Sequence, residues 1–356
     1  MTTSSQLAAA SSRTGDVRPA WPASTVVACL AVLAVLAVFP HLVGAYYVKI
    51  ATLALIFAYI CASWNIIGGY GGQMSLGHAM FFGIGSYSVA LFSFYQIGPA
   101  ILAVVAGVVV ALALSVFVAA ICFRYGLRGI YFAVGTLLVA EIVRIAVINT
   151  VWLGRSEGFS IAASDSVWDL RFGSLTPIYY IALAMVSAIA IGTRYLERSR
   201  LGFALITLRE QEESAQALGV DVNRAKRHAF VMSAVLTALG GSLYAVLVRY
   251  VSPGYDFALP LSLIMVMGTV LGGRGTVWGP ILGGIFMEFI QEGLSFAASI
   301  FGSTHIAVGS QVIYGLILVV VILAFPFGIV GTISQRFAAR RAHRVSETAD
   351  AVSARS

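Results

Sequence analysis

Polar side chains that fall inside long apolar runs are the residues of this chain best suited to chemistry. Ionisable groups inside a bilayer usually face a protein interior or a water-filled cavity, and they often mark the route of a polar solute. The sequence therefore contains candidate pathway residues in three places. They are Asn65, Gln73, Ser75 and His78 around a glycine-rich stretch, Glu141 and Arg144 in a later run, and Glu288 near Gln291 and Glu292.

Each of these groups also has a plainer interpretation. Glu141 and Arg144 are three residues apart, so they share a helix face and can neutralise each other. His78 can be a hydrogen-bonded packing residue, and Glu288 can lie near the outer rim in contact with water. Spacing alone leaves these alternatives open.

The glycine-rich stretch 67–77 contains five glycines, including Gly71. Glycine permits backbone conformations and close approaches that other residues forbid. Within a membrane such a stretch can break a helix and line a cavity, because irregular backbone is tolerated there only under cover of protein or water. The alternative is a tight turn with small-residue packing between helices.

Several other chemistries are excluded. A phosphate-binding loop ends in Gly-Lys-Ser/Thr, and the two lysines, Lys49 and Lys226, do not follow glycine. The cysteines Cys29, Cys61 and Cys122 lie singly in apolar runs, as buried hydrophobes do. We expect no metal site, no bound cofactor and no enzyme activity. The net charge of +7 lies in the segments between apolar runs, so membrane topology explains it better than nucleic-acid binding.

The elements that must position these residues are membrane helices. The chain of 356 residues is 59% hydrophobic and only 10% charged, whereas about 25% is usual for soluble domains. We predict an all-α polytopic membrane protein of about ten spans, because about 20 apolar residues cross a bilayer. The predicted spans are 25–44, 46–67, 72–96, 100–123, 129–150, 177–194, 228–249, 257–273, 279–298 and 309–331.

Basic residues orient these spans. With the N-terminus inside, the internal segments hold 17 of the 22 lysines and arginines, as the preference of cytoplasmic loops for positive charge requires. Both termini are then cytoplasmic. The predicted parts are a disordered N-terminus at 1–24, a membrane domain at 25–331 with a cytoplasmic loop at 195–227, and a disordered basic tail at 332–356. The first apolar run is treated as a span, although cleavage as a signal peptide is the alternative.

The charged loop within residues 198–230 predicts a short surface helix. Leu201, Leu205, Leu208, Ala215 and Leu218 recur with a helical period, with charges between them. Gly219 is placed to stop this helix, and Asp221 or Asn223 to cap the next one. Such a helix can dock on a cytoplasmic subunit or simply lie at the membrane surface.

Glu213-Ser214-Ala215-x-x-x-Gly219 resembles the EAA-x₃-G loop of ABC-importer permeases. Residues 64–79 and 272–280 resemble the same family, in its branched-chain amino-acid, LivM-type form, and the likeness runs from about residue 46 to 331. Ser214 replaces the first alanine of the loop, and the apolar-Pro end of the general motif is missing, which matches this subfamily.

The resemblance implies a role and partners for the chain. It would be a multi-pass permease subunit of the bacterial plasma (inner) membrane, forming the pathway with a second, LivH-like permease. Two cytoplasmic ATPases would bind ATP and dock on the loop, with Leu205, Arg209, Glu213, Ala215, Leu218 and Gly219 as coupling residues. An extracytoplasmic binding protein would deliver a small polar solute, and residues 151–176 would face it.

The solute stays open at this point. Branched-chain amino acids lead, urea or short amides are the alternative within the family, and sugars are less favoured. An amino-acid zwitterion needs a partner for each charge, which the intramembrane polar residues could supply. A self-sufficient secondary transporter or channel is the alternative class, favoured by Glu141 and Glu288.

Overall fold

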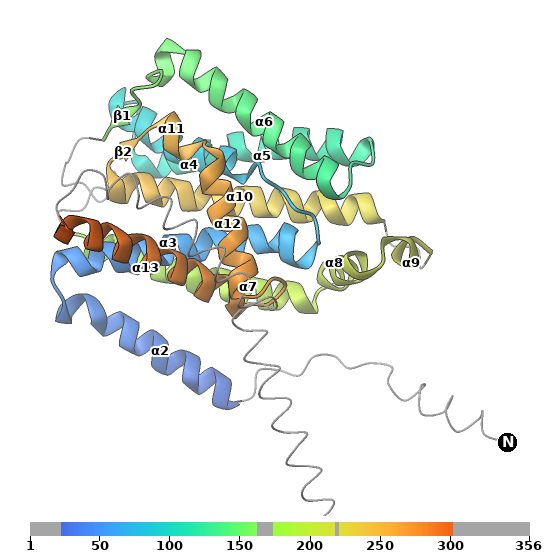
Figure 1. Cartoon of the computed structure of the whole chain (residues 1–356), viewed down its shortest axis with the longest axis horizontal. Helices are drawn as coiled ribbons and strands as arrows, with labels where there is room; N and C mark the ends of the chain where they lie inside the picture. Colours follow the sequence, from blue (N-terminus) through green and yellow to red (C-terminus); the bar gives the residue numbers. More distant parts are fainter. Residues whose placement is uncertain (1–22, 162–173, 218–220, 302–356) are drawn as a thin grey trace, which may run out of the picture.

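The computed structural model describes residues 23–161, 174–217 and 221–301, and these are almost entirely helical. In chain order the longer helices are α2 (Ala23–Leu42), α3 (Ala45–Asn65), α4 (His78–Phe94), α5 (Ala100–Arg124), α6 (Gly129–Asn149), α7 (Thr176–Arg198), α10 (Val222–Val248), α12 (Leu259–Gly272) and α13 (Trp278–Phe301). Most of them run lengthwise through one bundle, and α12 crosses the others (Figure 1).

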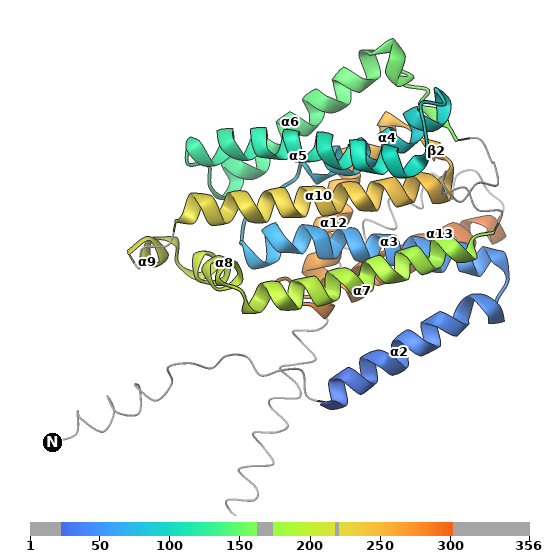
Figure 2. The same ribbon diagram turned by 180° about the vertical axis from the view of Figure 1, so that it is seen from behind.

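Short elements join these helices. They are a π turn (Ile66–Tyr70), a 3-10 turn (Val151–Leu153), α8 (Arg200–Glu210), α9 (Glu212–Ala217), α11 (Pro253–Asp256), and the strands β1 (Phe159–Ser160) and β2 (Tyr250–Val251). The strands pair antiparallel, with Phe159 opposite Val251. They lie at the end of the bundle opposite α8 and α9 (Figures 1 and 2).

The prediction of an all-α membrane protein is confirmed. Among the described residues, five helices are long and apolar enough to cross a membrane: α3 with its π turn, α5, α6, α7 and α10. Three shorter apolar helices accompany them, at Cys29–Leu42, His78–Phe94 and Leu259–Gly272. The predicted span 309–331 lies outside the described residues, so ten spans stay a prediction.

Two helix starts differ from the predicted spans. The helix expected from residue 72 begins only at His78, after a non-helical segment. The helix expected from 228 begins at Val222, because the Asp221 carboxylate accepts a hydrogen bond from the Arg224 backbone N–H at 2.9 Å. This N-cap satisfies a donor that the helix itself cannot.

Helix α10 is the centre of the bundle and packs against α3, α4 and α5. Small residues allow the close approach of α4 and α10: a Cβ at Gly241 would lie 2.0 Å from the Phe82 carbonyl oxygen, and one at Gly85 would lie 1.9 Å from that of Ala238. Close backbone approach through small residues is how membrane helices gain packing energy without a hydrophobic driving force.

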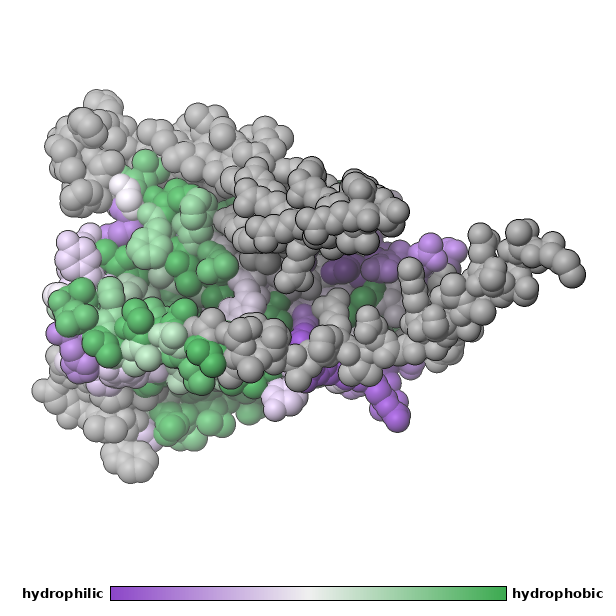
Figure 3. Space-filling model, turned by 90° about the horizontal axis from the view of Figure 1, so that it is seen from below, coloured by the Kyte–Doolittle hydropathy of each residue, from purple (hydrophilic) through white to green (hydrophobic). Residues whose placement is uncertain are grey.

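The outer surface fits a bilayer. Seen from below, hydrophobic residues gather over the middle of the described surface, and hydrophilic residues lie toward its ends (Figure 3). Exposed apolar side chains follow one face of α5, including Val109, Leu112, Val116 and Phe117. In water such a face would be unstable, whereas lipid tails solvate it.

Candidate functional site

Residues 71–77 form no helix, and at their start the Gly71 N–H donates to the Ile66 carbonyl oxygen and the Gln73 N–H to the Ile67 carbonyl oxygen. Side chains from elsewhere partner this backbone: the Trp64 indole N–H donates to the Ser75 carbonyl oxygen at 2.8 Å, and the Leu76 N–H donates to the Thr136 hydroxyl at 3.2 Å. Such partners are obligatory where water is absent. The helix break that the glycines permit is therefore present. Most of the segment is buried, but Gly72 and Met74 are exposed.

Gly77 shows why this segment needs glycine. A Cβ there would lie 2.3 Å from the backbone oxygen of Thr136, which belongs to α6. That contact is too short for any side chain and involves backbone, which cannot swing away. Glycine at this position serves close packing between the segment and α6.

His78 begins α4 and is completely buried. Its Nε2 lies 2.8 Å from the Ser233 hydroxyl, and its Nδ1 lies 2.9 Å from the Ser75 hydroxyl. The Ser233 hydroxyl donates its proton to the Ser63 carbonyl oxygen, so it must accept from Nε2–H, and Nδ1 must accept from Ser75. The neutral ring is fully satisfied and packs edge-on against Phe230, which fits the packing interpretation of His78.

Asn65 joins the first glycine-rich segment to the loop that follows α12. Its amide Nδ2 donates to the Thr276 carbonyl oxygen at 3.0 Å, and its Oδ1 accepts from the Gly275 N–H at 2.8 Å. Both contacts cross more than 200 positions of sequence. Two of the stretches singled out in the sequence, 64–79 and 272–280, are thus held together by one amide.

Arg209 brings the third stretch to the same place. From α8 its guanidinium donates to the Gly69 carbonyl oxygen at 3.1 Å. A Cβ at Gly275 would lie 2.2 Å from Nη1, and one at Gly72 would lie 2.9 Å from the Arg209 Cγ. Because both positions are glycine, the Arg209 side chain can pass between the two glycine-rich segments.

Helix α8 itself is anchored to the bundle. Leu205 is fully buried and Leu208 is 5% exposed. The Ser199 hydroxyl caps the helix by accepting from the Gly202 N–H at 3.1 Å. The predicted amphipathic pattern thus faces inward along α8, with Leu205 as its deepest point.

The neighbours Glu212 and Glu213 in α9 have opposite environments. Glu212 accepts from the buried Lys226 ammonium at 2.9 Å and pairs with Arg128 at 3.3 Å, which ties α9 to α10 and to the start of α6. Glu213 is exposed. Of the other predicted coupling residues, Leu218 and Gly219 lie outside the described residues, as does the side chain of Ala215.

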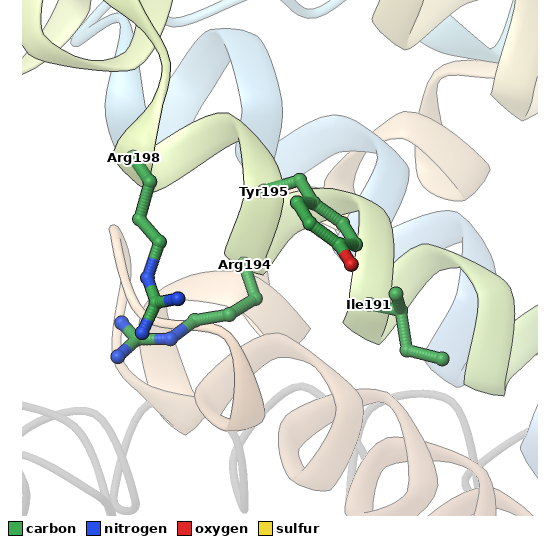
Figure 4. Close-up of a pocket in the computed structure, with 4 residues that line it drawn as sticks. All are labelled: Ile191, Arg194, Tyr195 and Arg198. Carbon is green, nitrogen blue, oxygen red and sulfur yellow. The ribbon is translucent and has the colours of Figure 1, made fainter. Parts of the chain in front are cut away.

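The end of α7 is linked to the same region. Arg194 pairs with the buried Glu197 at 2.6 Å, and Glu197 accepts from the Tyr70 hydroxyl at 3.0 Å. Figure 4 shows the guanidinium groups of Arg194 and Arg198 beside each other, while Tyr195 points away from them. The helix leading into the charged loop is therefore braced against the π turn that precedes residues 71–77.

The structure divides the predicted pathway residues. Asn65, Gly71, Gln73, Ser75 and His78 lie together and are buried, and the Gln73 Oε1 has no hydrogen-bond partner. Glu141 and Arg144 form a two-bond ion pair on the partly exposed surface of α6, as the neutralising alternative predicts. Glu288 lies apart on α13, only 4% exposed, so it is not at a solvated rim.

Sequence reasoning missed two groups. The position of Lys226 on the inner face of α10, with Ala225 and Ala229, is a signal of burial and of a need for a counter-ion. Asp256 in α11 is 1% exposed, and burial raises its pKa to about 7 despite a hydrogen bond from the Ser252 N–H. It ends a helix of four residues, which is too short to show a helical periodicity in the sequence.

Comparisons with known proteins identify the family. Residues 46–324 match the family model described as the branched-chain amino acid transport system / permease component. The permease protein LivM of Salmonella typhimurium is 29% identical over 78% of this chain and 71% of its own length, and that of Escherichia coli is 31% identical over 74% and 67%. The permease LivH of Escherichia coli is 30% identical over 51% of this chain and 53% of its own.

No solved structure matches the chain. The family match spans every described helix from α3 onward, including all three stretches that meet at Arg209. Together with the apolar helices, it establishes a multi-pass membrane protein. The chain belongs to the family of permease components of branched-chain amino acid transport systems.

Proposed function

We propose that this chain is the LivM-type membrane subunit of an ATP-driven importer in the bacterial inner membrane, and that its solutes are branched-chain amino acids. The observation that carries the proposal is the family match over residues 46–324. The relatives LivM and LivH are both named as branched-chain amino acid permeases, which supports a pathway built by two different permeases.

In this proposal both termini are cytoplasmic and residues 195–227 form the coupling loop of a membrane domain at 25–331. The distribution of charge supports it. Arg128 and Lys226 both bind Glu212, and Arg209 contacts the Gly69 carbonyl oxygen, at one end of the bundle. This is the end that the positive charge assigns to the cytoplasm.

Helix α9 is the proposed docking element for a cytoplasmic ATPase. Lys226 and Arg128 form ion pairs with Glu212, so a displacement of α9 is transmitted through these pairs to α10 and α6. The adjacent Glu213 stays exposed and free to meet a partner. Arg209 carries the same motion to both glycine-rich segments. An element that is fixed on one side and exposed on the other is suited to transmit force between subunits.

The proposed pathway borders the non-helical segment 71–77. Discontinuous helices mark solute sites in many transporters, and Gln73 supplies an unpartnered carbonyl oxygen there. The second permease would complete the pathway, and an external binding protein would dock at the end that carries β1 and β2. Glu141, Arg144 and Glu288 stay candidates for contact with the solute's charges.

Uptake of labelled leucine, urea and ribose by proteoliposomes containing all subunits tests the function. We expect ATP-dependent uptake of leucine and none of ribose. Urea uptake in place of leucine would change the assigned solute within the family. Leucine uptake by this chain without an ATPase would overturn the proposal in favour of a self-sufficient transporter.

A charge reversal tests the docking role separately. Glu213→Arg should abolish copurification of the ATPase and lower uptake, because it reverses the charge of an exposed residue at the proposed interface. Glu157→Arg reverses an equally exposed carboxylate at the opposite end of the bundle and should retain the ATPase. Normal ATPase retention by Glu213→Arg would remove α9 from the coupling role. Gly219→Pro should likewise lower uptake while the protein stays in the membrane.

A further inference from the structure

A groove of about 730 Å³ lies between α5, α8 and α10. Its lining borders the proposed coupling loop through Leu201, Arg224 and Arg227, but it includes none of the individual residues proposed for coupling or for the pathway. One end of it is basic, with Arg224, Arg227 and His228. The rest is apolar and is lined by Val116, Ala119, Ala120, Leu201, Val231, Met232, Val235 and Leu236. Among the described residues that line it, none carries a carboxylate.

The polarity of the groove follows from one face of α10. Arg224, His228, Val231 and Val235 succeed one another at helical spacing, so they form a single stripe that is charged for its first turns and apolar beyond. Arg124 continues the α5 side of the groove one turn past Ala120. The change from charged to apolar along the helix axis matches the change from lipid headgroup to acyl chain.

The basic side chains that line the groove can bind a further anion. Arg224, Arg227 and His228 are exposed, and no ion pair with a described carboxylate involves them. Within the described part of the chain, Arg227 donates to the Asn223 backbone oxygen alone, at 3.4 Å. Their neighbour Lys226, on the opposite face, is buried and paired with Glu212. The cations that brace the bundle are thus separated from those that face the groove.

The surroundings of the groove are those of a lipid-facing surface. Val116 and the adjacent Phe117 and Ile121 of α5 are exposed large hydrophobics, which a bilayer would cover. Clusters of basic residues between membrane helices at the cytoplasmic side bind anionic headgroups, and each basic residue near the surface contributes about 1 kcal/mol, or roughly fivefold in affinity.

We propose that this groove binds one anionic phospholipid, with its phosphate between Arg224, Arg227 and His228 and an acyl chain against Val231 and Val235. The site is distinct from the proposed coupling contacts of α9. The lipid-binding proposal requires only that the chain lies in a membrane. Its failure would therefore leave the proposed function unaffected.

Native mass spectrometry of the purified full-length chain tests the site, with phosphatidylglycerol and phosphatidylethanolamine of identical acyl chains as probes. We expect one phosphatidylglycerol to be retained preferentially. Arg224→Gln/Arg227→Gln should lower that preference by roughly 25-fold, from two contributions of about fivefold. Arg198→Gln/Arg274→Gln removes two charges from the same end outside the groove and should leave the preference unchanged.

A second variant separates the groove from general electrostatic attraction. Ala120→Trp fills the apolar part without changing charge and should also lower retention of phosphatidylglycerol. Equal retention of the two lipids, or equal loss in the control double variant, would overturn the proposal. Binding of glycerol 3-phosphate as tightly as the intact lipid would assign the groove to a free phosphate compound instead. Loss of the bound lipid on assembly with a second permease, with no lipid bound in the complex, would assign this face to the subunit interface.

Discussion

Buried charged side chains near the two ends of α10 differ in whether they have a partner of opposite charge. At the end that carries α8 and α9, Lys226 is 2% exposed and bonded to Glu212, and Glu197 is bonded to both Arg194 and Tyr70. Toward the other end, Asp256 and Glu288 are equally buried, yet each has one carboxylate oxygen without a hydrogen-bond partner.

The difference teaches which charges hold the fold together. A buried ion with a close partner fixes the position of two elements, and removing one member leaves the other uncompensated. A buried carboxylate without a cation is itself an unfavourable feature, since its desolvation is not offset. Neutralising the first kind should destabilise the protein, and neutralising the second kind should not.

The largest effect is expected from Lys226→Met. This change keeps an unbranched apolar side chain of similar size and removes the ammonium group, so Glu212 loses its closest partner and α9 its link to α10. The loss of stability should be about 3 kcal/mol, the range for breaking a buried pair. Thermal unfolding of the purified protein measures it. Arg227→Met, an exposed neighbour, is the matched control, and equal melting temperatures for the two variants would contradict the bracing role.

Arg209→Ala should have the next largest effect. It removes a charged hydrogen bond to the Gly69 carbonyl, a contribution of about 2 kcal/mol, and it frees the two glycine-rich segments from α8. Hydrogen exchange at 66–77 and 272–277 should increase together. Arg209→Lys supplies charge without the planar fork and should restore only part of the protection. Faster exchange in one segment alone would show that the arginine does not join them.

Much of this arrangement was readable in the sequence, for identifiable reasons. The helical class follows from apolar runs. Five glycines in eleven residues indicate that a helix can be interrupted there, although the predicted span begins at residue 72 and the helix only at His78. The Asp221 cap was one of two proposed, and the structure confirms it. These are local features, determined by residues close to one another in the chain.

The contacts that join distant segments were not predictable in this way. Nothing in the spacing of Asn65 indicates that it binds Thr276, or that Arg209 passes between Gly72 and Gly275, because such contacts depend on how whole helices pack. The different environments of Glu212 and Glu213 were not predictable either. They are adjacent residues of the same type in a short helix, so the sequence does not show which of them faces the bundle. The predicted coupling and pathway roles themselves stay predictions.

At the other end, Asp256→Asn should make stability less dependent on pH. Burial raises the pKa of Asp256 from its ordinary value of 3.8 to about 7, so the folded state holds a proton that the unfolded state has released between these values. The stability that this proton provides is complete below pH 4 and is lost as pH rises toward and beyond 7. The asparagine variant should therefore equal the parent at pH 4 and exceed it at pH 8, as measured by thermal unfolding. A variant less stable than the parent at pH 8 would mean that the charged carboxylate has a stabilising partner.

Glu288→Gln gives the smallest effect and the sharpest form of the comparison. The substitution keeps the shape of a side chain that is only 4% exposed and removes a charge that no described cation balances. Because the Glu288 Oε2 has no hydrogen-bond partner, loss of the carboxylate should change the free energy of unfolding by less than about 1 kcal/mol, or increase it. The same chemical change at Glu212→Gln weakens contacts to Lys226 and Arg128 and should be clearly destabilising. If both variants lost the same stability, pairing would not distinguish the two ends of the bundle. If Glu288→Gln kept its stability but lost uptake, the carboxylate would serve the solute rather than the fold.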